Sequence, residues 1–222
     1  MSNAEHDERR SAIIHAVWQV IAHSGMGAVS MRNVAAAADS SVGRVQYWFP
    51  SKDELLRASL EEMLSEAARV HSEATEDIDD REALWQLVGH PIPLAESSRA
   101  GVSVFHQYVA AAFNHPALAR MLAEAKEGEE SATSLLLGRV NPGLEDPRAT
   151  ARSLMATADG LSMRVLIGGL SAAEAEQALR TELDRFTTPE KEATTGTARG
   201  DHRRKSVVGS TKAPSGDGQG PP

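Results

Sequence analysis

The chain has 222 residues, of which 41% are apolar, 24% are charged and none is cysteine. The absence of cysteine excludes disulfide scaffolds, thiolate metal sites and cysteine nucleophiles, and it suits a reducing cytoplasm, where we expect the protein to act. No stretch approaches 18 uninterrupted apolar residues, so the sequence predicts no membrane-spanning helix. The polar start MSNAEHDERR predicts no secretory signal.

The formal net charge of −8 disfavours nucleic acid as a partner only when it is averaged over the whole chain. Residues 1–58 carry six basic and six acidic side chains, whereas residues 59–186 carry 11 and 21, and residues 187–222 carry six and four. Because exposed charges are screened over about 8–10 Å, the neutral first part can still present a local basic face.

The last segment, residues 187–222, is predicted to be a disordered tail. Gly, Pro, Ser, Thr and charged residues dominate it, and no apolar period survives. Such a composition buries too little surface to offset the entropy of ordering the chain. The basic run Arg203-Arg204-Lys205 could touch DNA phosphates, but a solvated tail is the interpretation we favour.

Everything before the tail is predicted to be helical, so the expected fold class is all-α with about nine helices. Sustained period-2 alternation is absent. Apolar residues recur instead at helical spacing between caps and breakers. The helix that follows Ser51 is expected to end near Val70. The start signals are Ser30, Ser41, Ser51 with Glu54, Asp79 with Glu82, Pro116, Asp146-Pro147, and Ser171 with Glu174.

Two short helices, expected at residues 31–38 and 42–48, have the spacing of a helix-turn-helix. Ser30 and Ser41 are placed as their N-caps. An apolar seam between the two helices is predicted from Val34, Val42 and Val45. Asp39 stands where the turn needs a left-handed residue, a conformation that Asp tolerates better than most residues.

Gly43 lies inside the second of these helices, where glycine costs about 1 kcal/mol relative to alanine. We interpret it as allowing the backbone to approach a phosphate or a base edge closely. Nearby, Arg44 can read guanine, Gln46 can read adenine, and Tyr47 can reach a phosphate or a thymine methyl. Helix N-termini suit phosphate, and Lys52 lies at the next one. The alternative is that these polar side chains are simply solvated.

The segment GMGAVSMRNVAAAADSSVGRVQYWFPSKDELLRASLEEM resembles the N-terminal domain of the tetracycline-repressor-like (TetR) family of transcriptional regulators, and the strong match covers about residues 9–64. The family pattern runs S/T-hydrophobic-R-x-I/V-A, then A-G-V-S-x-G-x-hydrophobic-Y-x-Y/H-F, then K-x-x-L-L. The chain departs from it at Asp39, where the family prefers Gly, and at Ser40, where Val is usual. It supplies Ser30, Arg32, Val34, Ala35, Ser41, Gly43, Tyr47, Phe49, Lys52, Leu55 and Leu56.

The resemblance implies a homodimeric repressor with a helix-turn-helix domain at residues 1–52 and an effector-binding and dimerisation domain at residues 53–186. The dimer interface would be formed by residues 147–168 and 171–186. Two recognition helices about 34–36 Å apart predict a palindromic operator of double-stranded DNA. Together with the residue types, the resemblance implies DNA contacts from Ser30, Arg32, Ser41, Gly43, Arg44, Gln46, Tyr47 and Lys52.

The effector pocket is expected among large apolar residues of the second domain, because pockets in helical bodies are mainly apolar with few polar groups. Most of these residues are ordinary core in the alternative interpretation. His106 and Gln107 flank the aromatic stripe and are the candidate polar contacts. No catalytic, metal-binding or cofactor-binding motif is present. The candidate effector-binding residues are Met63, Trp85, Phe105, His106, Tyr108, Phe113 and Met121.

We therefore expect a ligand-responsive transcriptional regulator rather than an enzyme. A small molecule would enter the second domain, move the helix that begins near Ser51, and change the separation of the two DNA-binding domains of the dimer. This works only if the molecule prefers the form that does not bind DNA. The alternative function is an all-α interaction or binding module that has kept the helix-turn-helix only as structure.

Overall fold

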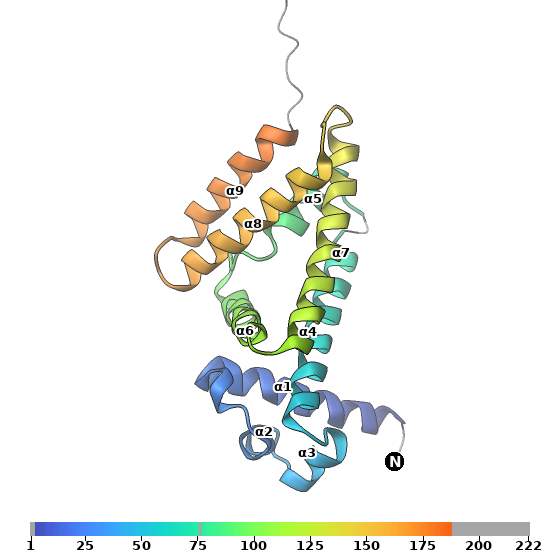
Figure 1. Ribbon diagram of the computed structural model, residues 1–222, viewed down its shortest axis with the longest axis vertical. Helices are drawn as coiled ribbons and strands as arrows, with labels where there is room; N and C mark the ends of the chain where they lie inside the picture. Colours follow the sequence, from blue (N-terminus) through green and yellow to red (C-terminus); the bar gives the residue numbers. More distant parts are fainter. Residues whose placement is uncertain (1–2, 76, 188–222) are drawn as a thin grey trace, which may run out of the picture. The chain divides into compact units, whose positions relative to one another are not determined.

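The computed structural model describes residues 3–75 and 77–187, and within these ranges the chain is all-α, as predicted (Figure 1). The nine helices found there agree with the number expected from the sequence. They are α1 (Asn3–Ser24), α2 (Met31–Ala37), α3 (Val42–Trp48), α4 (Lys52–Ala74), α5 (Asp80–Gly89), α6 (Glu96–Ala112), α7 (Pro116–Val140), α8 (Pro147–Leu166) and α9 (Ala172–Thr187), with the short 3-10 helix η1 (Met26–Ala28) between the first two.

The predicted N-caps form because a side-chain oxygen accepts one of the free N–H groups of each first turn. Ser30, Ser41 and Ser51 each accept from the backbone N–H three residues ahead. At α9 the capping box is reciprocal, because Ser171 Oγ accepts from Glu174 N while Glu174 Oε2 accepts from Ser171 N. These four helix starts were therefore predictable from local sequence.

The end of α4 differs from the sequence prediction. The helix continues to Ala74 instead of ending near Val70. Thr75 closes it, because its backbone N–H and its hydroxyl both donate to the free carbonyl of His71. A threonine that satisfies the last carbonyls is a weaker stop signal in sequence than glycine, which explains the error.

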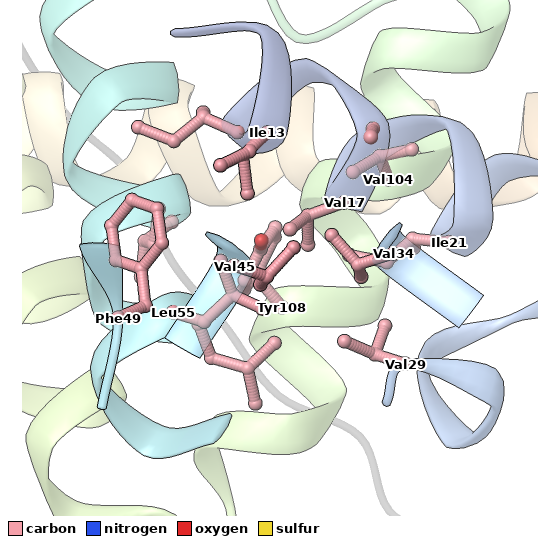
Figure 2. Packing of buried hydrophobic residues seen from close by; sticks show 14 of the residues in the cluster. Ile13, Val17, Ile21, Val29, Val34, Val45, Phe49, Leu55, Val104 and Tyr108 are labelled. Atoms are coloured by element: carbon pink, nitrogen blue, oxygen red, sulfur yellow. The ribbon is translucent and has the colours of Figure 1, made fainter. Parts of the chain in front are cut away.

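The first hydrophobic core joins the N-terminal helices to α6 and to the start of α7. Helices α1 to α4 contribute most of its buried residues, and α6 contributes Val104 and Tyr108. Figure 2 shows Tyr108 among Val17, Val45 and Leu55, with Phe49 beside them. The first core thus extends across the division at residues 52 and 53 that the sequence suggested.

The second core is formed by α5, the C-terminal half of α7, α8 and α9. Figure 1 shows α8 and α9 running side by side, in agreement with their many contacts. The end of α8 is capped by Arg99, whose guanidinium donates to Leu166 O at 2.9 Å. The guanidinium of Arg180 lies 3.6 Å from the ring centre of Trp85, a cation–π contact that fixes α9 on α5.

Residue 187 belongs to α9 and not to the tail, which corrects the predicted boundary by one residue. Thr187 is buried, and its hydroxyl accepts from Arg81 Nη2 at 2.9 Å. Asn141 Nδ2 donates to the neighbouring Phe186 carbonyl at 2.8 Å. The remainder of the predicted tail, residues 188–222, lies outside the described residues. None of the described helices is long and apolar enough to cross a membrane.

Two side chains lie elsewhere than the apolar pattern predicted. Val42 was expected in the seam of the helix-turn-helix but is 37% exposed, so Val34 and Val45 form that seam without it. Phe113 was placed on the buried stripe of α6 but is 83% exposed. On α7, Glu130 is held between Arg148 and Arg152 of α8, each at 3.0 Å or less.

Two leucines of α7 test the second core. Leu137 is fully buried, whereas Leu135 is 70% exposed on the same helix. We expect Leu137→Ala to lower the free energy of unfolding by about 2–5 kcal/mol, because it removes buried apolar volume and leaves a cavity. Leu135→Ala should lower it by about 0.5 kcal/mol or less. Urea unfolding followed by circular dichroism measures both, and equal effects would contradict the assigned packing.

Candidate functional site

The turn between α2 and α3 is a Schellman motif with aspartate at the position that glycine usually takes. Asp39 has φ 47°, and it is the one non-glycine residue with positive φ in the described chain. Ser40 N donates to Ala35 O at 2.8 Å and Asp39 N donates to Ala36 O at 3.3 Å, which are the two bonds of the motif. The left-handed conformation predicted for Asp39 is confirmed.

Helix α3 is anchored by very few buried groups and leaves most of its surface open. Val45 is its one buried residue, and Phe49 at its C-cap is 3% exposed. Tyr47 is 75% exposed, and Arg44 and Gln46 are exposed as well. A seven-residue helix packed in this way leaves its polar side chains exposed.

Gly43 is not required by the protein interior. A Cβ added there would meet no atom within 4 Å, and its φ is not positive. The cost of glycine in this helix is therefore not explained by internal packing or by backbone geometry. Gly43 is exposed, so the backbone of α3 is open to solvent beside Arg44.

The charges around α3 are favourable for an anionic partner. Between residues 30 and 52, the basic side chains Arg32, Arg44 and Lys52 outnumber the single acidic one, Asp39. Arg32, Arg44 and Lys52 are all exposed. Next in sequence, the carboxylate of Asp53 is held by Arg57 Nε at 2.8 Å and His115 Nε2 at 2.6 Å. The helix-turn-helix thus has a net basic surface within an acidic chain.

A second feature is a cavity of about 500 Å³ between α6, α7 and α8. Three of the seven predicted effector-binding residues line it, namely Phe105, His106 and Phe113. The other four lie elsewhere: Tyr108 is fully buried in the first core, Met63 and Met121 pack against that core, and Trp85 belongs to the second core. The full lining is Phe105, His106, Val109, Ala112, Phe113, Ala119, Leu122, Ala123, Lys126, Asp159, Gly160 and Met163.

The polar centre of the cavity is Lys126, which the sequence analysis did not single out. Its Nζ lies 3.0 Å from Asp159 Oδ1 and 3.2 Å from Glu129 Oε2. Burial lowers the pKa of Lys126, but the two carboxylates outweigh burial and hold that pKa above its ordinary value. The only local signal was one lysine within the acidic run EAKEGEE, and only the fold shows that α8 supplies Asp159.

Helix α6 also contacts the helix-turn-helix region directly. One residue after the cavity-lining His106, Gln107 accepts from Met26 N at 2.8 Å and donates to Ile21 O at 3.3 Å. These bonds hold the end of α1 and the start of η1 around Gly25, whose φ is 82°. Helix α4 contributes no residue to the cavity lining. Within the described residues, no group of three His, Asp or Glu side chains is placed to hold a metal ion.

Known proteins match both parts of the chain. The model of bacterial regulatory proteins of the tetR family matches residues 13–59, and the model of the C-terminal domain of BetI-type transcriptional repressors matches residues 80–188. The chain is 31% identical to the HTH-type transcriptional regulator BetI of Stenotrophomonas maltophilia. The aligned region of 173 residues covers 75% of this chain and 86% of that relative.

Solved structures agree with these matches. A TetR-family transcriptional regulator from Rhodococcus sp. superposes with a TM-score of 0.73 at 26% identity, covering 82% of this chain and 100% of that one. A transcriptional regulator from Saccharomonospora viridis in complex with choline also gives a TM-score of 0.73 at 26% identity, covering 80% of this chain and 96% of that one. The chain therefore belongs to the TetR family of transcriptional regulators, with a C-terminal domain of the BetI type.

Proposed function

We propose that the protein is a homodimeric, non-enzymatic repressor that a small molecule releases from a palindromic operator. The observation that carries this proposal is the double role of α6. One face of that helix lines the cavity through Phe105 and His106, and the next residue, Gln107, bonds to the helix-turn-helix region. A ligand that alters α6 therefore acts on a helix that already contacts the DNA-binding helices.

In this proposal α3 enters the major groove and the surrounding caps hold phosphates. Arg44 and Gln46 read base edges, while Tyr47 contacts a phosphate or a thymine methyl. Gly43 allows the backbone of α3 to lie close to the duplex. The N-termini capped by Ser30 and Ser41, together with Arg32 and Lys52, bind phosphates and fix the register of α3.

The proposed dimer uses the outer faces of α8 and α9. On α9, Ala173, Gln177, Ala178 and Thr181 are exposed along a shallow groove that small side chains leave open. At the end of α8, Ile167 is 75% exposed although it is strongly apolar. Burial of these surfaces against a second copy would give a four-helix interface with two-fold symmetry.

The effector would act on α4 through α6 and α7, because α4 itself contributes no residue to the cavity lining. Both helices line the cavity, and His115 at the start of α7 donates from Nε2 to Asp53 in the first turn of α4. The effector must bind the non-operator form more tightly to shift the population. The choline complex of the Saccharomonospora relative supports a small organic molecule as the effector of such a pocket.

Selection of bound sequences from random duplexes, followed by footprinting, tests the proposal as a whole. A protected sequence with two-fold symmetry at moderate salt is the expected result. Release of that duplex by members of a small-molecule library would support the ligand response. Failure of the intact chain to protect any sequence would favour the interaction module instead.

The glycine of α3 should show a conflict between stability and binding. Gly43→Ala is expected to raise the free energy of unfolding by up to about 1 kcal/mol, because alanine favours the helix and its Cβ meets no atom. The same methyl should weaken operator binding by about 1–3 kcal/mol. Gly128→Ala in α7, where a Cβ also meets nothing, should match the gain in stability without weakening binding. Unchanged operator affinity of Gly43→Ala would contradict the proposed approach of the backbone.

Arg44 and Lys52 should differ in what their removal does. Arg44→Ala is expected to cost about 1–3 kcal/mol and to relax specificity at one base position. Lys52→Ala should weaken binding to all sequences alike and reduce the slope of log K against log salt by about 1. Binding titrations at several salt concentrations measure both effects, and Arg120→Ala, an exposed charge on α7, is the control. Equal, small effects of Arg44→Ala and Lys52→Ala would argue against DNA readout.

Loss of the Gln107 side chain should loosen the helix-turn-helix region. Gln107→Leu removes both bonds and leaves the partly buried Met26 N–H unpaired, at a cost of about 1–3 kcal/mol. We expect faster hydrogen exchange over residues 25–29 and weaker operator binding. Gln86→Leu, which removes an exposed bond within α5, should change neither. Unaltered exchange in Gln107→Leu would show that α6 does not hold this region.

A further inference from the structure

The cavity between α6, α7 and α8 already contains a positive charge, which belongs to the protein itself. Lys126 Nζ lies 5.6 Å from the ring centre of Phe105, within the range of a cation–π contact. Asp159 and Glu129 pair with the same ammonium at 3.0 and 3.2 Å. A cationic ligand would bind to an aromatic face and to carboxylates. Here the ammonium of Lys126 already contacts the Phe105 ring and both carboxylates.

The remaining walls offer no second place for a quaternary ammonium. Such ions are recognised by several aromatic faces around one point. None of the described Trp or Tyr residues lines this cavity. Its rings besides Phe105 are His106, which stands edge-on to Phe105 with the ring centres 6.0 Å apart, and Phe113, which is 83% exposed. Apart from His106, Lys126 and Asp159, the lining is apolar or glycine.

We propose that Lys126 fills the cation subsite of this pocket, so that the pocket rejects quaternary ammonium ions and takes an uncharged, mainly apolar molecule with a carbonyl oxygen at one end. The inference rests on the proposed function only in treating this cavity as the effector site. Lys126 is thereby the residue that determines specificity.

The charge balance of the lining favours an uncharged head group. Lys126 and Asp159 are its two charged residues, and they are paired with each other. A cation must displace a tethered ammonium that is held at high effective concentration. An anion could reach the third N–H donor of Lys126, but the two carboxylates of Asp159 and Glu129 around a single ammonium would repel it. A carbonyl oxygen meets no such repulsion and can accept from that third donor, because the two carboxylates take two of the three N–H groups.

The test is calorimetric titration of the full chain with three probes that share an eight-carbon chain, namely octanamide, octanoate and octyltrimethylammonium. For the unmodified protein we expect octanamide to bind at least tenfold more tightly than either ion. In Lys126→Met the aromatic face and both carboxylates become free, so octyltrimethylammonium should gain at least tenfold in affinity and octanamide should lose affinity.

Arg120→Met is the matched control, because it removes one positive charge from the same helix outside the cavity lining. It should leave the affinities for all three probes within about twofold, which separates the local role of Lys126 from a change in net charge. Circular dichroism verifies folding of each variant. If Lys126→Met does not fold, the ranking of probes by the unmodified protein and the affinities of Lys126→Gln decide the matter.

The proposal is overturned if octyltrimethylammonium or octanoate binds the unmodified protein as tightly as octanamide. It is overturned equally if Lys126→Met folds without gaining affinity for the cation, or if none of the probes binds. Operator titrations of the same preparations separate these outcomes from failure of the proposed function. Operator binding with the opposite probe ranking rejects only the ligand class, whereas the expected ranking without operator binding rejects the regulatory role alone.

Discussion

The hydrogen bond between Tyr108 and Ser59 connects the pocket-bearing helix to the helix that follows the DNA-binding motif. Tyr108 Oη lies 2.5 Å from Ser59 Oγ, and both side chains are fully buried. Ser59 donates its single hydroxyl proton to Leu56 O, so Tyr108 is the donor. Burial raises the pKa of Tyr108 to about 12, which keeps the phenol protonated and the bond intact at physiological pH. Sliding of α6 along α4 would break this buried hydrogen bond and leave its polar groups unpaired.

Under the proposed function, this bond is one route by which a change in the pocket would reach the helix-turn-helix. His106 lines the cavity, Gln107 holds the end of α1 and Tyr108 holds α4, so three successive residues face three different parts of the molecule. A helix turns by about 100° per residue, which is what allows this division. Packed interiors shift between discrete arrangements rather than deforming gradually. Under the proposed function, a ligand that favours another position of α6 would also favour another position of α1 and α4, which α6 holds.

The helix N-caps and the left-handed turn could be predicted from neighbouring residues, whereas pairings between distant residues could not. The caps at Ser30, Ser41 and Ser171 and the left-handed Asp39 depend on residues within one turn, and all are present. Phe113 lies outside the core because α6 ends there, where the apolar period no longer matches a packed neighbour. The pairing of Lys126 with Asp159 joins residues 33 positions apart, and no spacing rule relates them.

The helix-turn-helix combines two locally unfavourable choices, and the first core makes them tolerable. Asp39 holds a left-handed conformation that costs an L-residue roughly 1–2 kcal/mol, and Gly43 costs about 1 kcal/mol within α3. Burial of the Val34 and Val45 side chains stabilises the folded state by about 1.5–3 kcal/mol each. The stability of α3 therefore comes from the packing of its buried Val45 and its C-cap Phe49 against the neighbouring helices, not from the helix propensity of its residues. Because Val45 and Phe49 belong to the same core as residues of α1, α4 and α6, a displacement of these helices would change the packing that supports α3.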